Sequence, residues 1–205
     1  MRGNKRDFFS NYILKMKNIY VLIGPPLSGK ETQGELLETS LGGIPRFSMG
    51  HLIREARNKD QKFENAYQQY SMQGKHLPNE IKFPLLADEM NKASQSGFIL
   101  DNFPATEEDV EYLERYLVGK DLNMKTVIVL NVSRDEMKKR FEIAKNRRGR
   151  ADDTIENIVD RREIQDSDRM AVLNHYEKMG LLRMINGEQS VEKVHQDILR
   201  EIDKS

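Results

Sequence analysis

The sequence contains no cysteine, which excludes a disulfide-bonded scaffold, thiolate metal ligands and a thiol nucleophile. It also has no excess of either charge, because 33 basic residues balance 33 acidic ones, so composition does not indicate a basic face for nucleic acid. No apolar run reaches the roughly 18 residues that a membrane-spanning helix needs. We therefore expect no nucleic-acid or membrane partner, and any anion site must be built locally.

The 205 residues are enough to bury one sizeable core. We assign residues 1–17 to an N-terminal extension and residues 18–205 to a single domain. The extension is basic and poor in acidic residues, a composition that also occurs in transit peptides. A loosely docked extension on a cytoplasmic protein is the simpler interpretation.

Five apolar runs predict the strands of a parallel sheet. The run at residues 19–23 is continuous and rich in β-branched residues, which is typical of a strand buried on both faces. Similar runs occupy residues 97–101, 126–131 and 181–185, and a weaker one occupies residues 45–49. Between them, apolar residues recur at helical spacing, for example at Ile81, Leu85, Leu86 and Met90. Strands that alternate with helices predict a doubly wound α/β fold.

A phosphate-binding loop follows the first predicted strand directly. The residues of this G-x-x-x-x-G-K motif are Gly24, Pro25, Pro26, Leu27, Ser28, Gly29 and Lys30. A strand before the motif and a helix after it are the context in which backbone N–H groups and the helix dipole bind phosphate. Glu31 stands where such loops usually carry Ser or Thr, and Thr32 follows. The Glu31 carboxylate would either help to hold a metal ion or repel phosphate.

Further along the chain, several segments in order resemble the adenylate kinase family. The loop is similar to the family's G-x-P-G-x-G-K-G-T-Q, with Leu27 and Glu31 in place of glycines. Residues 49–54 resemble the family's T-G-D-x-x-R motif. Residues 74–78 resemble the segment that touches the acceptor base, and residues 97–106 resemble the D-G-F-P-R-T region. The arginines of the family's short lid have counterparts at Arg140, residues 149–153 and Arg161. The family's backbone contact with adenine has its counterpart at Asn186-Gly187. The resemblance spans about residues 18–203.

This resemblance implies a P-loop NTPase-type three-layer sandwich with a five-stranded parallel sheet, a helical acceptor-binding insertion near residues 48–77 and a short lid near 141–150. It implies ATP contacts from residues 24–32, Arg140 and Gly187, and a catalytic role for Lys30, Arg140, Arg150 and Arg161. The acceptor set that it implies is Met49, Gly50, Arg54, Lys75, His76, Leu77, Asn102, Ala105, Asp109, Arg150 and Arg161. Taken singly, the three lid-region arginines would be read as solvated helix charges.

Asp101 ends the predicted strand 97–101, at the edge of the sheet where α/β proteins bind ligands. A carboxylate near a P-loop lysine is suited to hold the Mg²⁺ of ATP, often through water. The alternative for Asp101 is that it caps the helix that follows.

The departures from the family pattern cluster in the acceptor half. Ala105 replaces the arginine that grips the acceptor phosphate, and Asp109 replaces the glutamine that reads adenine. Asn102 and Met49 replace a glycine and a threonine, and Ala144 replaces a second lid arginine. One lost charge-assisted contact costs roughly 1.5–3 kcal/mol, so Ala105 alone should weaken acceptor binding.

Two functions follow from this pattern. The first is a monomeric, Mg²⁺-dependent kinase that transfers the γ-phosphate of ATP to a nucleoside monophosphate, AMP by family analogy. The alternative is a degenerate relative that binds nucleotide with little or no transfer and acts as a sensor or interaction partner. A P-loop GTPase or transport ATPase is disfavoured, since the sequence has no N-K-x-D-type guanine motif and no separate Walker B partner.

Overall fold

The computed structural model describes residues 16–73, 75–93, 97–144 and 155–205. Most of the predicted N-terminal extension, and the lid from residue 145 onward, therefore lie outside the described residues. Among the described helices, none is long and apolar enough to cross a membrane.

Five parallel strands form one sheet in the order β2-β3-β1-β4-β5. The strands are β1 (Lys17–Ile23), β2 (Arg46–Ser48), β3 (Gly97–Asp101), β4 (Leu122–Asn131) and β5 (Leu182–Asn186). All five predicted strands are confirmed. The bounds differ most at β4, which begins at Leu122 rather than Thr126 because its ladder with β1 starts at Lys17. β1 lies at the centre, and its last five residues are buried, as its apolar run predicts.

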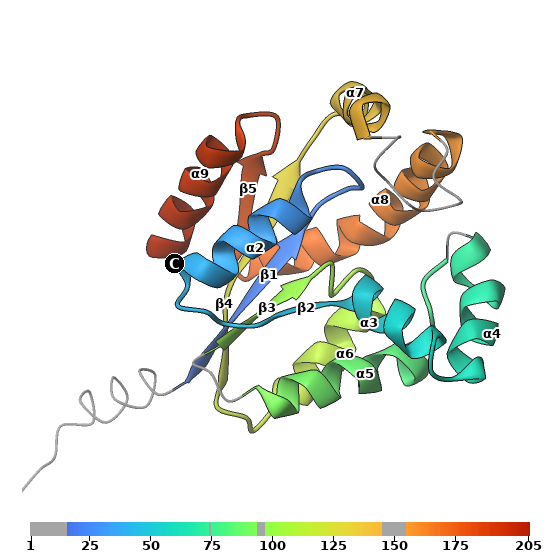
Figure 1. Ribbon diagram of the computed structural model, residues 1–205. Helices are drawn as coiled ribbons and strands as arrows, with labels where there is room; N and C mark the ends of the chain where they lie inside the picture. The colour runs from blue at the N-terminus through green and yellow to red at the C-terminus, as the bar shows by residue number, and fades with distance from the viewer. Residues whose placement is uncertain (1–15, 74, 94–96, 145–154) are drawn as a thin grey trace, which may run out of the picture.

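Helices cover both faces of the sheet and make a three-layer sandwich (Figure 1). On one face lie α2 (Lys30–Ser40) and α9 (Val191–Asp203), and on the other α5 (Asn79–Lys92), α6 (Glu107–Leu117) and α8 (Ile155–Lys178). Alternate residues of β1 serve the two cores, because successive strand side chains point to opposite faces. Tyr20 and Leu22 pack with the α2–α9 cluster, whereas Ile19, Val21 and Ile23 pack with the α5–α6–α8 cluster.

The remaining helices lie beyond the carboxyl ends of the strands. α3 (Met49–Arg57), α4 (Gln61–Gln69) and the short 3₁₀ helix η1 (Ser71–Gln73) follow β2, and α7 (Arg134–Ala144) follows β4 (Figure 1). The chain leaves β1 through α2 towards β2 on one side, and β4 lies on the other side. In sheets of this kind, ligands bind in the crevice where the strand order reverses, so the fold itself places a site beyond β1.

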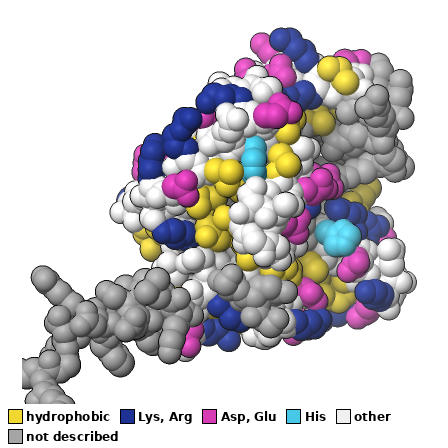
Figure 2. All heavy atoms as spheres, turned by 60° about the vertical axis from the view of Figure 1, so that its left-hand side comes forward, with side chains coloured by type: hydrophobic (Ala, Val, Ile, Leu, Met, Phe, Trp, Pro, Cys, Tyr) yellow, Lys and Arg dark blue, Asp and Glu magenta, His cyan; other side chains and the backbone are white. Residues whose placement is uncertain are grey.

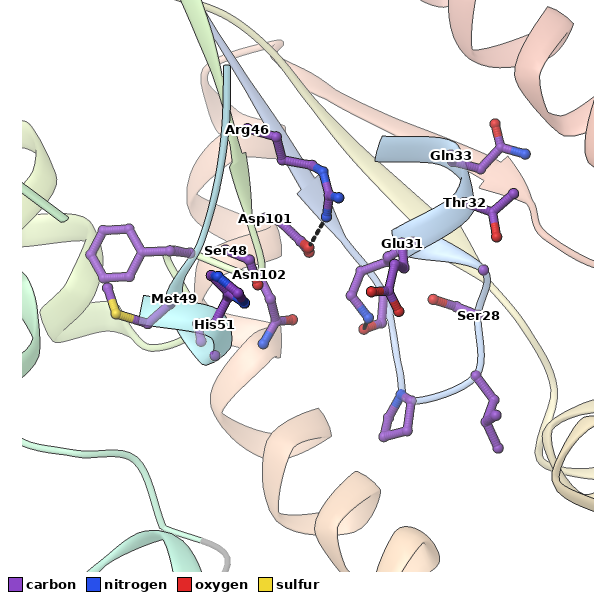
Figure 3. A pocket seen from close by; sticks show the side chains of 18 of the residues that line it. Ser28, Glu31, Thr32, Gln33, Arg46, Ser48, Met49, His51, Asp101 and Asn102 are labelled. Atoms are coloured by element: carbon purple, nitrogen blue, oxygen red, sulfur yellow. Dashed lines mark hydrogen bonds and ion pairs between the residues drawn. The ribbon is translucent and has the colours of Figure 1, made fainter. Parts of the chain in front are cut away.

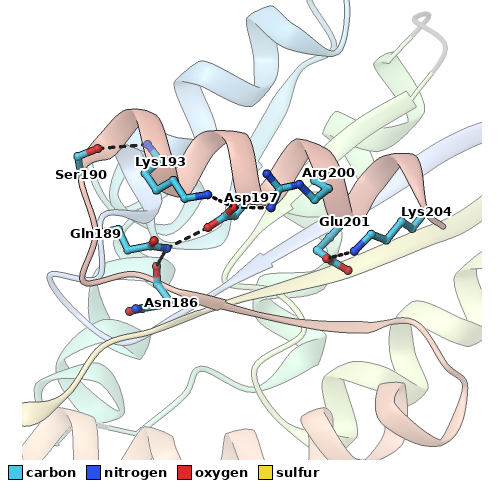
Figure 4. Close-up of polar contacts among 8 residues, drawn as sticks. All are labelled: Asn186, Gln189, Ser190, Lys193, Asp197, Arg200, Glu201 and Lys204. Atoms are coloured by element: carbon cyan, nitrogen blue, oxygen red, sulfur yellow. Dashed lines mark hydrogen bonds and ion pairs between the residues drawn. The ribbon is translucent and has the colours of Figure 1, made fainter.

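The turn between β5 and α9 is held by a polar network on the first half of α9. Ser190 caps the helix, and the Gln189 side chain donates to the Asn186 carbonyl and to Asp197 (Figure 4). Asp197 also pairs with Lys193 at 2.7 Å. This network keeps the residues after β5 in a fixed turn at the edge of the crevice.

The face shown in Figure 2 carries basic and acidic side chains that are interspersed. Neighbouring opposite charges along α9, such as Arg200 and Asp197 at 3.0 Å, pair with each other. This arrangement agrees with the balanced composition of the chain.

Candidate functional site

A cavity of about 1270 Å³ opens at the carboxyl ends of the strands. Its wall includes most of the residues predicted for the two nucleotides: Gly24, Pro26, Leu27, Ser28, Gly29, Lys30, Glu31, Thr32, Met49, Gly50, Arg54, Lys75, His76, Leu77, Asp101, Asn102, Ala105, Asp109, Arg140 and Gly187. Pro25 does not contribute to the wall. Arg150 lies outside the described residues, and Arg161 belongs to α8, where its side chain is not described. The fold therefore brings the P-loop and the predicted acceptor segments to one continuous space.

Leu27, one of the two P-loop residues that replace family glycines, adopts the left-handed backbone that glycine favours. Leu27 has a φ of 63° and Gly29 a φ of 90°, both in the left-handed region. A leucine in this region costs roughly 1–2 kcal/mol, so the surroundings must hold it there. The Leu27 carbonyl accepts a hydrogen bond from Arg140 Nη1 at 3.1 Å, which is one such restraint.

Lys30 is held at the entrance of the loop. Its Nζ donates to the carbonyls of Gly24 and Pro25 at 2.8 and 3.2 Å. Lys30 begins α2, whose N-terminal N–H groups and dipole favour an anion at the same place. The ammonium and the N-terminus of α2 thus lie at the same end of the loop, a position that suits an anion.

Arg140 connects three parts of the site from α7. Its Nη1 reaches Leu27, its Nη2 donates to the Gly187 carbonyl at 2.7 Å, and its Nε donates to Glu136 at 2.9 Å. Gly187 packs closely against Val132 and Asn131. A Cβ added at this position would lie only 2.7 Å from Val132 Cγ2. The guanidinium therefore links the P-loop to the turn after β5, where adenine was predicted to contact the backbone.

The metal-binding prediction for Asp101 fits its surroundings. The residue is 6% exposed, and its Oδ1 is buried without a hydrogen-bond partner among the described residues. The alternative, that Asp101 caps the next helix, is wrong, because Thr106 is the N-cap of α6. An unpaired carboxylate oxygen at this place suits a water-mediated contact to Mg²⁺. No cluster of three or more metal-ligating side chains occurs in the described part of the chain.

Asp101 has a partner that the sequence did not predict. Its Oδ2 pairs with Arg46 Nη1 at 3.0 Å, and the guanidinium lies between β3 and α2 (Figure 3). Glu31 lines the same cavity from the first turn of α2 and is exposed. The side of the cavity where a metal ion was predicted thus contains the buried carboxylate of Asp101 and the exposed carboxylate of Glu31.

The acceptor half of the cavity begins at the N-terminus of α3. Met49 is buried, whereas Arg54 is exposed and faces the cavity from the same helix. At Gly50, a Cβ would lie 3.3 Å from Arg54 Nη1, so the glycine leaves room for this guanidinium. Lys75 and Leu77 continue this wall, with Lys75 exposed and Leu77 buried.

A buried ion pair closes the acceptor half. Lys82 Nζ lies 2.7 Å from Asp109 Oδ1, and the two side chains are 4% and 0% exposed. Asp109 Oδ2 also accepts from the backbone N–H groups of Ala105 and Thr106, and Thr106 Oγ1 accepts from Asp109 N, which completes a capping box for α6. The residue at the family's adenine-reading position is therefore engaged by a cation and a helix cap.

His76 lies beside this pair. Burial lowers the pKa of His76 below its ordinary value of 6.5, and the nearby Lys82 ammonium lowers it further. Its Nε2 is 3.6 Å from Asp168 Oδ2, which is too long for a hydrogen bond. The imidazole is therefore mainly neutral at pH 7.

The structure adds cavity residues that the sequence interpretation did not assign. The main ones are Gln33, Arg46, Ser48, Ile53, Arg57, Tyr67, Ser71, Lys82, Phe103 and Gln189. Arg46 and Lys82 matter most, because each neutralises a predicted site carboxylate. The family motifs include neither residue, and no local spacing relates them to their partners.

The adenylate kinase family model matches residues 22–181 of this chain. Among curated proteins, "Adenylate kinase" of Corynebacterium aurimucosum is 33% identical over 186 residues, which cover 90% of this chain and 99% of that protein. The protein of the same name from Corynebacterium urealyticum is 34% identical, over 90% of this chain and 98% of its own. The protein of this name from Leptospira biflexa is 30% identical, over 89% of this chain and 98% of its own length. The chain belongs to the adenylate kinase family.

In this adenylate kinase family member, two residues that replace glycines adopt the left-handed backbone that glycine favours. Leu27 and Asn102 stand where the family has glycine, and both keep a left-handed backbone, with φ values of 63° and 57°. Asn tolerates this region better than most residues. Leu27 and Asn102 add no charge to the site of this adenylate kinase homologue, whereas Ala105 and Asp109 each change the charge relative to the family pattern.

Proposed function

We propose that this chain transfers the γ-phosphate of ATP to a nucleoside monophosphate and so yields two nucleoside diphosphates. AMP is the acceptor that family membership supports. The observation that carries the proposal is the single cavity that joins the P-loop to the acceptor residues of α3 and α5–α6. Since the relatives are named for this activity, they favour catalysis over the degenerate alternative.

No side chain needs to act as a nucleophile in this reaction, because an acceptor phosphate oxygen attacks the γ-phosphorus in line. Lys30 and the start of α2 hold the donor phosphates, and Arg140 approaches them from α7. Arg54 binds the acceptor phosphate from α3, and Arg150 and Arg161 supply further positive charge. Asp101 would hold a Mg²⁺ ion through water, and the ion would supply positive charge that offsets the charge of the transferred phosphate. Catalysis is thus positioning and electrostatic stabilisation.

We further propose that residues 48–77, which contain α3, α4 and η1, form an acceptor-binding part, and that residues 141–150 form a short lid. Closure of both parts would exclude water and suppress ATP hydrolysis. Small-angle scattering should show a more compact particle with a bisubstrate inhibitor than without it, and equal dimensions would contradict closure. We expect a monomer located in the cytoplasm.

A phosphotransfer screen tests the proposed function. ATP and Mg²⁺ are incubated with AMP, CMP, UMP, GMP or dTMP, and diphosphate formation is followed for each acceptor. Lys30→Ala, which removes the P-loop ammonium, is the matched negative control. Product with one acceptor that is lost in Lys30→Ala supports the kinase. Absence of product with every acceptor, from protein that binds ATP, would favour the non-catalytic alternative.

A further inference from the structure

Arg46 is anchored in the cavity from two sides. Its Nη1 pairs with Asp101 Oδ2 at 3.0 Å, and its Nε pairs with Glu38 Oε2 at 3.4 Å. The other Glu38 oxygen accepts from the Arg46 backbone N–H at 3.2 Å. With its side chain only 15% exposed, Arg46 is a fixed cation between α2 and β3 (Figure 3).

The path of this side chain depends on a glycine of α2. A Cβ at Gly34 would lie 2.5 Å from Arg46 Cδ and 2.7 Å from Arg46 Nε. Real Cβ atoms do not approach neighbours this closely, so any other residue at position 34 must displace the arginine. Gly34 therefore provides the groove along α2 in which Arg46 reaches Asp101.

This contact changes what Asp101 offers to a metal ion. An arginine stays protonated at all physiological pH values, so it neutralises the carboxylate permanently. Asp101 Oδ2 is engaged by Arg46, whereas Oδ1 has no hydrogen-bond partner among the described residues. A divalent cation that approaches Oδ1 meets less net negative charge and a fixed guanidinium nearby.

The same guanidinium favours the phosphates of a nucleotide. Arg46 lines the cavity together with Lys30 and the P-loop, so its charge is present whether or not a metal ion accompanies ATP. Removing it should weaken the binding of metal-free ATP and, at the same time, release Asp101 for the hydration shell of Mg²⁺. The two effects change the metal dependence of ATP binding in the same direction.

We propose that Arg46 is a positioning residue that competes with the divalent cation for Asp101 and reduces the dependence of nucleotide binding on Mg²⁺. The inference rests on the proposed function, because it takes ATP to bind at the P-loop beside Asp101. It predicts that the ratio of the ATP dissociation constant in EDTA to that in Mg²⁺ is smaller in the natural protein than in variants without this contact.

The test measures both dissociation constants by calorimetry for the natural protein, Arg46→Gln and a matched control, Arg183→Gln. Arg183 also pairs with a glutamate, Glu201 at 3.7 Å, but it does not line the cavity. We expect the EDTA-to-Mg²⁺ ratio to rise at least about tenfold in Arg46→Gln, the effect of one charged hydrogen bond. It should not change in Arg183→Gln, and an equal rise in both variants would overturn the proposal.

A second variant leaves all charged residues of the chain unchanged. Gly34→Ala should push Arg46 off Asp101 and raise the same ratio, while alanine is favoured over glycine inside a helix. If Arg46→Gln does not fold, the dissociation constants of Gly34→Ala test the proposal in its place. ATP binding with an unchanged ratio in the folded variants would overturn this inference alone. Failure of the natural protein to bind ATP with or without Mg²⁺ would overturn the proposed function and this inference with it.

Discussion

Replacing Asp109 by asparagine should strongly destabilise the folded protein. Lys82 Nζ lies 2.7 Å from Asp109 Oδ1, and both side chains are almost completely buried. Asparagine has nearly the same shape, and its oxygen can still accept from the N–H groups of Ala105 and Thr106. The change thus removes the negative charge with little effect on the capping box, and it leaves the Lys82 ammonium buried without a counter-ion.

The size of the effect follows from this burial. Breaking a buried ion pair by removing one partner costs about 3–5 kcal/mol. In a chain of this length each kcal/mol lowers the melting temperature by about 2–4 °C, so Asp109→Asn should lower it by roughly 6–20 °C. The double variant Lys82→Met/Asp109→Asn removes both charges and should recover most of the loss, because paired removal is often close to neutral.

The assay is chemical and thermal unfolding of the natural protein, both single variants and the double variant, evaluated as a double-mutant cycle. Lys92 and Glu89 provide the matched control, since they also lie 2.7 Å apart but have side chains 69% and 34% exposed. Glu89→Gln should cost less than about 1 kcal/mol. An Asp109→Asn cost as small as that of Glu89→Gln would refute the reasoning, because it would mean that water reaches the Lys82–Asp109 pair.

Three further predictions concern the acceptor half. Arg54→Ala should lower kcat/KM for the acceptor and leave the ATP dissociation constant unchanged, because Arg54 faces the cavity from α3 and not from the P-loop; equal losses for both nucleotides would count against its assignment. Ala105→Arg should raise kcat/KM for the acceptor on the order of tenfold, since it restores one charged contact to the phosphate; no gain in steady-state assays would show that the acceptor phosphate lies elsewhere. Burial holds the pKa of His76 below 6.5, so the unfolded chain takes up this proton first as the pH falls, and stability is lost below about pH 6.5. His76→Gln should therefore flatten the decline in urea-unfolding free energy between about pH 7 and 5, and parallel profiles would contradict this assignment.

The strands were predictable where burial produces an unbroken apolar run. β1 and β3 lie in the middle of the sheet with helices over both faces, so nearly every side chain in them is apolar and buried. The first part of β4 was missed, because Leu122 to Lys125 are only half-buried and mix polar with apolar residues. β2 has only three residues, which are too few for a strand's alternation of buried and exposed side chains to be recognised in the sequence.

The P-loop was predictable because its chemistry is local, whereas the hydrogen bond from Arg140 to Gly187 was not predicted from the sequence. These two residues are 47 positions apart, and Arg46 and Asp101 are 55 apart. Hydrophobic periodicity relates neighbours on one helix or strand, and it carries no information on which charged residue of one element faces which residue of another. Arg46 and Lys82 were therefore found only in the structure.

By itself, the sequence determined the α/β class, the P-loop and the family, since alternating buried strands and helices and a glycine-rich turn are encoded over short stretches. The tertiary structure decided which charged side chains of the site pair with each other. It placed Arg46 on Asp101 and Lys82 on Asp109, so that two of the three acidic residues predicted for the site pair with cations from other elements. The physical reason is that an ion pair forms where packing brings two side chains together out of water, and packing is a property of the whole core.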